Sequence, residues 1–218
     1  MMQLIMEQIQ TGGDRNFGYL LGDPTEKVAA LIDPSNNPKQ LIQRAKDQGM
    51  SVEWIINTHG HYDHVNGNEE VKKETGAKIA IYEESSVPHD LGIPDNGELL
   101  VGHIKLKFLH TPGHYPDHMV IYNPDYHFAF TGDHLFVGKV GGTASEKAAR
   151  EEYDSLQRVF RELPSHTTVW PGHNYGCRPS STLELERASN PFVQCKTFEE
   201  FLELKANWTE IKTSRGLM

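Results

Sequence analysis

The stretch Asn57–Gly67, NTHGHYDHVNG, concentrates three histidines and one aspartate within six residues: His59, His61, Asp63 and His64. Imidazole and carboxylate groups at this density are typical of a metal site. The chain contains 12 His, yet its composition alone would produce only about 0.002 matches to the pattern H-x-H-x-D-H. The pattern therefore predicts metal binding rather than a chance cluster on a solvated loop.

The position of this stretch also predicts how its ligands divide. The preceding residues 52–57, VEWIIN, form a short apolar run that predicts a strand. Side chains two residues apart on an extended chain point to the same side, so His59 and His61 can share one ion. Asp63 and His64 follow in a turn and should face elsewhere. We therefore expect two adjacent metal subsites.

Three more candidate ligands follow later apolar strands. HTPGH ends at His114, FAFTGD ends at Asp133 and TTVWPGH ends at His173, and each strand breaks at Gly or Pro. Loops at the ends of strands present ligands from a rigid scaffold. A lone His or Asp is usually structural, so it is the shared context that makes these three residues candidates.

The rest of the chain predicts one mixed α/β domain over residues 1–218, with a short helical tail from about residue 180. Helical periodicity predicts a buried face on the helix 145–163: Ala148, Tyr153, Leu156, Val159 and Phe160. Strands are predicted at 4–13, 16–23, 28–35, 52–59, 77–84, 103–113, 118–125, 127–133 and 167–173, and helices at 37–49, 66–76, 145–163 and 197–211.

Composition limits the partners that we expect. The formal net charge of -9 argues against nucleic acid, which needs a basic face. We find no signal peptide and no apolar run long enough for a bilayer, so we expect a cytoplasmic protein without a membrane partner.

The two cysteines, Cys177 and Cys195, form no disulfide framework. We expect Cys177 to be a small buried residue.

Five segments in order, LIDPS, THGHYDH, TPGH, TGDHLF and PGH, resemble the metallo-β-lactamase superfamily. Within it, the chain is similar to the glyoxalase II group (hydroxyacylglutathione hydrolases) and the related persulfide dioxygenases. The resemblance extends from about Asn16 to Pro191. It implies an α/β fold, the αββα sandwich, in which two mixed sheets lie between helical layers and the site lies at one edge of the sheets.

The resemblance also implies a ligand set. It assigns metal 1 to His59, His61 and His114, assigns metal 2 to Asp63, His64 and His173, and makes Asp133 the bridge between them. We expect two divalent ions, zinc first, with iron or manganese as alternatives. A metal-bound hydroxide would then attack a small-molecule thioester, ester or lactone, and Asp63 or Asp133 would orient the water or carry its proton.

Around these ligands, we expect four supporting residues. Asp33 in LIDPS should fix a ligand imidazole, although an Asp before Pro is also a common turn former. Tyr175 could meet the substrate, and Lys139 and Arg178 could hold an anionic part of it. We expect a structural hydrogen bond from His118, and a His134 ring that points away from the ligands.

Three functions remain open at this point. The loop after Asp133 is shorter than in the glyoxalase II group, so the thioester need not contain glutathione. A persulfide dioxygenase would hold one iron with His59, His114 and Asp133, but the Cys-Gly-Arg stretch typical of those enzymes is missing. A non-catalytic metal-binding module would have no open coordination position and no turnover.

Overall fold

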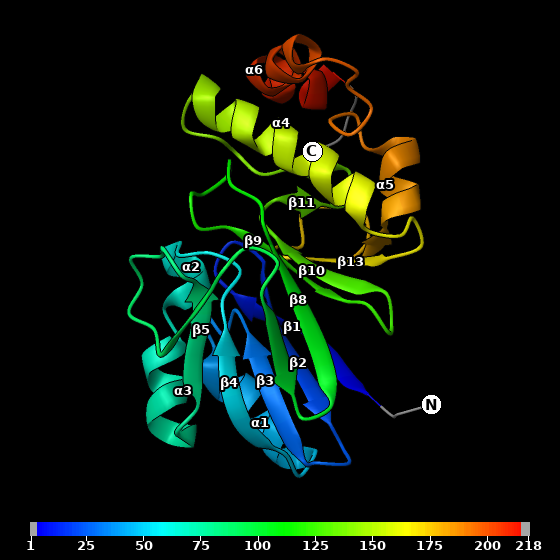
Figure 1. Cartoon of the computed structure of the whole chain (residues 1–218). Coiled ribbons are helices and arrows are strands. Elements are labelled where there is room, and N and C mark those ends of the chain that lie inside the picture. The colour runs from blue at the N-terminus through cyan, green and yellow to red at the C-terminus, as the bar shows by residue number, and fades with distance from the viewer. Residues whose placement is uncertain (1–3, 215–218) are drawn as a thin grey trace.

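Two six-stranded mixed sheets lie face to face in the computed structural model, which describes residues 4–214 and the side chains of residues 4–211 (Figure 1). The first sheet has the order β1-β2-β3-β4-β5-β6; it is antiparallel from β1 to β3 and parallel from β3 to β6. Its strands are β1 (Ile5–Gly12), β2 (Asn16–Asp23), β3 (Val28–Ile32), β4 (Ser51–Ile56), β5 (Lys78–Tyr82) and β6 (Leu91–Ile93).

The second sheet has the order β14-β13-β10-β9-β8-β7, in which β10 and β13 pair in parallel and the other neighbours are antiparallel. A short hairpin, β11-β12, follows β10. The strands are β7 (Glu98–Val101), β8 (Ile104–His110), β9 (Met119–Asn123), β10 (Phe128–Gly132), β11 (Leu135–Phe136), β12 (Lys139–Val140), β13 (Thr168–Pro171) and β14 (Ser181–Thr182).

Three apolar clusters separate the layers and confirm the predicted αββα sandwich. The central cluster joins the facing sides of the sheets, with Tyr19 and Ile32 from the first and Phe108 and Phe130 from the second. The other two clusters join each sheet to helices on its outer face. Helices α1 (Pro38–Asp47) and α3 (Asn68–Thr75) cover the first sheet, and α4 (Glu146–Glu162), α5 (Leu183–Ser189) and α6 (Phe198–Ser214) cover the second.

The helix α4 begins where the sequence predicts, because the Ser145 hydroxyl accepts a hydrogen bond from the Ala148 N–H. Its buried face differs from the prediction, however. Ala148 and Tyr153 are only half-buried, and the Tyr153 ring lies against Phe198 and Phe201 of α6. The buried residues of α4 are Ala149, Glu152, Ser155, Leu156, Val159 and Phe160.

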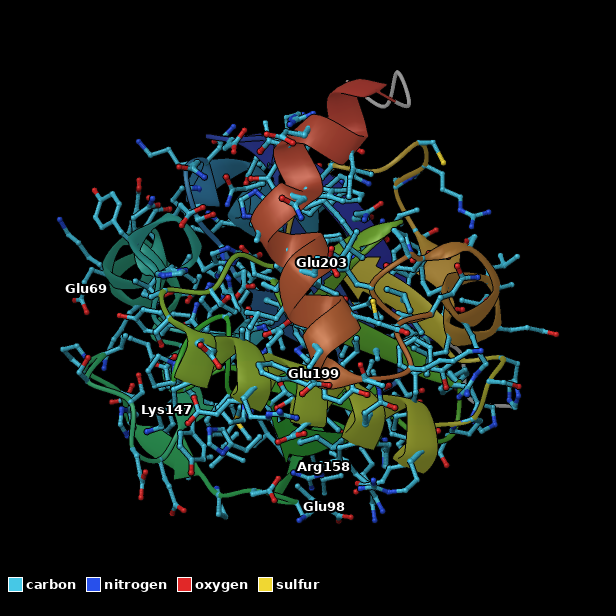
Figure 2. The ribbon with its side chains drawn as sticks, turned by 90° about the horizontal axis from the view of Figure 1, so that it is seen from above. Glu69, Glu98, Lys147, Arg158, Glu199 and Glu203 are labelled. Carbon is cyan, nitrogen blue, oxygen red and sulfur yellow. The ribbon has the colours of Figure 1, made fainter. Side chains whose placement is uncertain are left out.

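The predicted helical tail consists of two helices, α5 and α6, and α6 crosses over α4 on the outside of the second sheet (Figure 2). The predicted limits of the domain include residues 1–3 and 215–218, which lie outside the described residues. Within residues 4–214, every helix is too short or too polar to cross a membrane.

Candidate metal centre

The first four candidate ligands leave the end of β4. The strand places Thr58 and His59 in the interior, and the single-turn helix α2 (Tyr62–Val65) then carries Asp63 and His64. The turn brings the His64 ring back over His59, with ring centroids 4.2 Å apart. The two predicted subsites are therefore in direct contact.

One group of ligand atoms joins this loop to the loop after β8. His59 Nε2 lies 2.9 Å from His61 Nδ1, and His61 Nδ1 lies 3.0 Å from His114 Nε2. The three atoms are mutually within 4.8 Å, close enough to hold one metal ion. The imidazoles that the resemblance assigns to metal 1 thus converge in the structure.

A second group joins the same loop to the loop after β13. His64 Nε2 lies 3.2 Å from His173 Nε2. Asp63 Oδ2 lies 3.5 Å from His173 Nε2 and 3.8 Å from His64 Nε2. These ligand atoms also lie within 4.8 Å of one another, and they are the residues that the resemblance assigns to metal 2.

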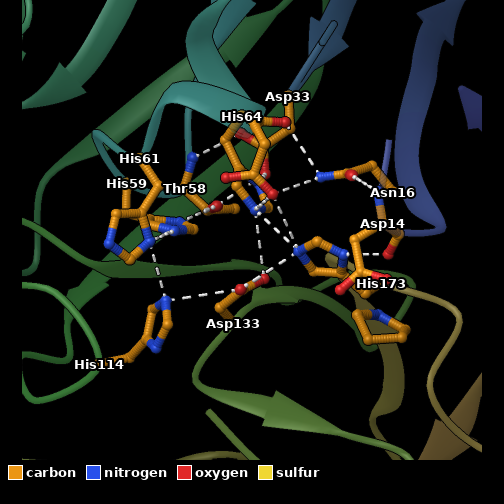
Figure 3. A network of polar contacts seen from close by, with 12 residues as sticks. Asp14, Asn16, Asp33, Thr58, His59, His61, His64, His114, Asp133 and His173 are labelled. Carbon is orange, nitrogen blue, oxygen red and sulfur yellow. Dashed lines mark hydrogen bonds and ion pairs between the residues drawn. The ribbon is translucent and has the colours of Figure 1, made fainter. Parts of the chain in front are cut away.

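Asp133, at the end of β10, lies between the two groups (Figure 3). Its Oδ2 is 3.4 Å from His114 Nε2 and 3.3 Å from His173 Nε2. Its Oδ1 is 3.3 Å from His64 Nε2 but has no hydrogen-bond partner among the described side chains, although it is buried. A buried carboxylate oxygen in this state fits a bridging metal ligand.

The outward-facing nitrogens indicate where the imidazole protons are. Carbonyl oxygens can only accept, so His114 Nδ1 donates to Gly142 O at 2.8 Å and His173 Nδ1 donates to Asp14 O at 2.8 Å. His64 Nδ1 likewise donates to Asp33 Oδ2 at 2.9 Å. Because each Nδ1 carries a proton, the Nε2 atoms are the ring nitrogens left to face inward, where a bound cation would take the place of any Nε2 proton.

Asp33 is the main support of the first loop, as the sequence predicts. Its Oδ1 accepts from the Thr58 N–H at 2.8 Å, and its Oδ2 accepts from the Thr58 hydroxyl at 2.7 Å and from His64. Since Thr58 gives its hydroxyl proton to Asp33, His59 Nδ1 donates to Thr58 Oγ1 at 3.1 Å. One buried carboxylate thereby orients two ligand rings.

The electrostatics of the site favour positive charge around Asp133. Burial acts to raise the pKa of Asp133, but His64, His173 and His59 hold it well below its usual range. Burial acts to lower the pKa of His64, but Asp133 and Asp33 raise it well above its usual range. Burial lowers the pKa of His59 well below its usual range. The group thus combines one ionised carboxylate with a neutral imidazole beside it.

Two residues that the sequence did not single out hold the second group. Asn16 Nδ2 donates to Asp63 Oδ2 and to the Asp63 carbonyl, both at 3.0 Å. Asp14 accepts from His173 through its carbonyl and from the Tyr175 hydroxyl through Oδ2 at 2.5 Å. They lie at the turn from β1 to β2, where the sequence carries no metal-type motif.

The predicted substrate residues differ in position. The Tyr175 ring stacks on His173 at 4.7 Å, and Lys139 Nζ lies 4.2 Å from the Tyr175 centroid. Arg178 is exposed and donates to Ser181, whereas Arg15, which was not predicted, lies 4.8 Å from the Tyr175 centroid. Lys139 and Arg15 both lie beside Tyr175, which stacks on the candidate ligand His173, so both border the candidate metal centre.

Cys177 is exposed, so its predicted burial is wrong. It lies in the stretch 177–179, a loop whose three residues are all exposed. The loop follows β13 and His173, and its exposure leaves the small Cys177 side chain open to water. Its position near a ligand in the sequence therefore gave no guide to its burial.

The two remaining histidines near the ligands are buried. His118 Nε2 accepts from the Asp133 N–H at 3.2 Å, which confirms the predicted structural hydrogen bond. His134 belongs to none of the ligand groups, and its Nδ1 lies 3.1 Å from Glu152 Oε1. Glu152 was missed by the sequence analysis, although the spacing from Ala149 to Leu156 places it on the buried face of α4.

Comparisons with known proteins identify the family to which this fold belongs. A family model described as "Metallo-beta-lactamase superfamily" matches residues 11–173. A hydroxyacylglutathione hydrolase of Pelagibacter ubique (strain HTCC1062) is 34% identical over 164 residues, which cover 73% of this chain and 67% of that protein. The mitochondrial persulfide dioxygenase ETHE1 of Homo sapiens is 32% identical over 195 residues, which cover 88% of this chain and 76% of that protein.

Solved structures of related proteins share this fold. The crystal structure of ETHE1 from Myxococcus xanthus superposes with a TM-score of 0.87 at 30% identity, covering 94% of this chain and 91% of that one. A protein crystallised in a di-iron-bound form, TTHA1623, superposes with a TM-score of 0.70 at 28% identity, covering 85% of this chain and 99% of that one. Hydrolase and dioxygenase relatives are thus matched at similar identity.

Proposed function

Since the chain belongs to the metallo-beta-lactamase superfamily, we propose that it is a metal-dependent hydrolase that cleaves a small thioester, as its relatives named hydroxyacylglutathione hydrolase do. One observation carries the proposal. The inward-facing nitrogens of two imidazole groups converge on Asp133, whose buried Oδ1 has no hydrogen-bond donor among the described side chains. This donor set fits two adjacent divalent ions, zinc first, with Asp133 as the bridge.

Bound at these residues, a pair of divalent ions would polarise a carbonyl group and supply a hydroxide near neutral pH. The chain itself fixes the geometry around that chemistry. Asp33, Thr58, Gly142 and Asp14 hold the outer nitrogens of the imidazoles and therefore their tautomers. No Ser or Cys nucleophile is required in this mechanism.

Asp63 is the carboxylate that we assign to proton transfer. Burial acts to raise its pKa, but the Asn16 side chain and then His64 and His173 lower it, so the carboxylate is ionised near neutral pH. Its side chain is 42% exposed, whereas that of Asp133 is 9% exposed. Asp63 is therefore the ligand carboxylate that solvent reaches and that can accept a proton from an attacking water.

Lys139 and Arg15 support an anionic substrate. Both cations lie over the Tyr175 ring, which stacks on the candidate ligand His173. The chain carries a formal net charge of -9, so an anion needs local positive groups to approach the site. We assign the charged end of the thioester to this side of the centre.

A second candidate function is persulfide dioxygenase. The 32% identity to human ETHE1 over 88% of this chain favours it. That activity would use His59, His114 and Asp133 as a facial triad for one iron, with the remaining histidines as neighbours. The two functions differ in the number of ions and in the need for oxygen.

A substrate screen on protein of known metal content tests the proposal. Thioesters, lactones and glutathione persulfide are each added, and product formation and oxygen uptake are followed together. We expect release of thiol from a thioester without oxygen uptake. Oxygen uptake with glutathione persulfide and no thioester turnover would favour the dioxygenase, and bound metal without any turnover would favour a metal-binding module.

A further inference from the structure

Glu152 is a buried acid that the proposed reaction does not use. It lies in the middle of α4, on the face that packs against the second sheet, and it is 0% exposed. A buried carboxylate is costly unless hydrogen-bond donors or an opposite charge compensate for lost water. The partners of Glu152 therefore indicate why an acid occupies this position.

The two carboxylate oxygens of Glu152 contact two different ligand loops. Its Oε2 accepts from the backbone N–H of His114 at 2.7 Å. Its Oε1 lies 3.1 Å from Nδ1 of His134, whose own side chain is 0% exposed and which directly follows Asp133 in the chain. One side chain of α4 thus hydrogen-bonds to the loop of His114 and lies close to the loop of Asp133, where Glu152 Oε1 and His134 Nδ1 are near each other without hydrogen-bond geometry.

The loop before His114 is shaped to fit against α4. Gly113 has a φ of +136°, and a Cβ at this position would lie 2.3 Å from the backbone nitrogen of Glu152. Ser155, one turn further along α4, donates to the carbonyl of Pro112 at 2.8 Å. Any larger residue at 113 would push the loop off the helix, so the contact with Glu152 depends on this close approach.

The ring of His114 is fixed independently of its backbone. Its Nδ1 donates to Gly142 O, and the neighbouring carbonyl of Gly141 accepts from Lys205 of α6 at 2.7 Å. Helix α6 therefore restrains the segment that orients the ring, while Glu152 restrains the backbone. Together they leave His114 Nε2 directed at His61 Nδ1, 3.0 Å away.

We infer that Glu152 is a positioning residue for the subsite formed by His59, His61 and His114. The inference rests on the proposed metal centre but not on the identity of the substrate. The hydrogen bond and the ion pair of Glu152 do not involve Asp63, His64 or His173, which form the other subsite. Those three ligands are supported by Asp33, Asn16 and Asp14. Glu152 reaches the shared ligand Asp133 only through its neighbour His134, and the Asp133 N–H stays bonded to His118. The effect of Glu152 on metal binding should therefore fall mainly on the subsite of His114.

The test compares metal affinities of Glu152→Ala and Glu152→Gln with those of the unaltered chain, by competition with a chelator for Zn²⁺. We expect Glu152→Ala to weaken binding of one ion by about 10–100-fold, the usual effect of losing a group that orients a ligand. Glu152→Gln keeps an oxygen for the His114 N–H and should restore part of that loss. Binding of the other ion should change by less than about 3-fold, because its ligands keep their partners.

Glu186→Gln provides the matched control. Glu186 is also 0% exposed on a helix over the second sheet, and its Oε2 accepts from the Gly138 N–H at 2.8 Å and from Asn190 at 2.9 Å. It contacts none of the candidate ligands through these bonds. We expect this variant to lower the unfolding temperature of metal-free protein without changing either metal affinity.

Two background variants assign the affected subsite. In Asp63→Ala, which retains His59, His61 and His114, Glu152→Ala should weaken the remaining ion. In His61→Ala, which retains the other subsite, it should have little effect. The inference would be overturned if Glu152→Ala weakened metal binding equally in the Asp63→Ala and His61→Ala variants. It would also be overturned if Glu152→Ala alone changed the affinity for neither ion. If the protein bound metal but had no turnover, the proposed hydrolase would be wrong. The role of Glu152 could still be tested, because the test measures metal affinity and not activity.

Discussion

The two halves of the candidate metal centre are built differently. The half from the first sheet takes four ligand residues from one stretch after β4, and a single buried side chain, Asp33, orients His59 through Thr58 and His64 directly. The half from the second sheet takes one ligand from each of three loops, and each loop has its own partner: Glu152, His118 and Asp14. In the compact motif one side chain orients two of the four ligands, and Asn16 holds a third, Asp63. Each of the dispersed ligands has a separate partner, which only folding brings to it.

Asp133 joins the halves, so its loss should have the largest effect. Asp133→Ala removes the carboxylate that contacts His64, His114 and His173. Loss of a group that only orients a ligand costs about 10–100-fold in metal affinity, so loss of this direct ligand should cost more. We expect metal and turnover to disappear together, measured by elemental analysis and by thioester hydrolysis. Full metal content with full turnover would break the bridging assignment.

A variant of Asp33 tests how the ligands from the first sheet are oriented. Asp33→Asn keeps the size of the side chain, and Asn tolerates the φ of 47° found at this position. The amide cannot accept all three hydrogen bonds that the carboxylate accepts, so binding of the ion at Asp63, His64 and His173 should weaken by about 10–100-fold. Binding at the other subsite should weaken less, because Asp33 reaches His59 only through Thr58. Chelator competition measures the loss. An unchanged affinity would mean that Thr58 and His64 are oriented without Asp33.

Asp23 lies at the opposite end of β2 from Asn16 and provides a comparison outside the metal centre. Burial acts to raise its pKa, but hydrogen bonds from His103 and Thr25 lower that pKa to about 2. Because the folded-state pKa lies below the unfolded value of about 3.9, its stabilisation is complete above pH 4 and is lost as the pH falls towards 2.

The expected stabilisation is on the order of 1 kcal/mol, because the partner His103 is more than half exposed to water. Urea unfolding of metal-free protein between pH 5 and pH 2 measures it. Asp23→Asn should flatten the pH dependence relative to the unaltered chain by this amount. Identical pH dependence in both proteins would show that the Asp23–His103 link between the sheets contributes nothing measurable.

Tyr175 gives the smallest expected effect, because it is only one of several supports for His173. Tyr175→Phe keeps the stacked ring and removes the hydrogen bond to Asp14, while the Asp14 carbonyl still accepts from His173. Burial and the nearby Asp14 raise the pKa of Tyr175, so its hydroxyl remains a donor near neutral pH. We expect metal affinity to fall by less than about 5-fold, the size of one partly exposed hydrogen bond. A larger loss would place Tyr175 among the main supports.

The difference between the compact motif and the dispersed ligands also explains how much of the site the sequence could predict. The motif at His59–His64 follows from spacing and strand geometry. The apolar runs predicted the main strands of a mixed α/β domain, whereas the family resemblance implied the sandwich. The short strands β6, β7, β11, β12 and β14 were missed, because two to four residues carry too little periodicity. Glu152, Asn16 and Asp14 were missed because their roles arise from contacts with residues far away in the chain.

Arg178 and Arg15 show the limit of sequence proximity. Arg178 follows His173 closely but its guanidinium is directed at Ser181, whereas Arg15 reaches Tyr175 from the turn between β1 and β2. The loop geometry after β13, which the sequence does not encode as a local pattern, decides which cation borders the site. Distance along the chain is therefore a weak guide once a ligand loop leaves its strand.

The central claim, a binuclear hydrolytic centre, is tested most directly by the metal content of protein purified without chelators. Elemental analysis of such protein, after removal of loosely bound ions, counts each metal per chain. The convergence of both ligand groups on Asp133 predicts two divalent ions per chain. One ion per chain, all of it iron, would contradict the binuclear hydrolase and favour the dioxygenase.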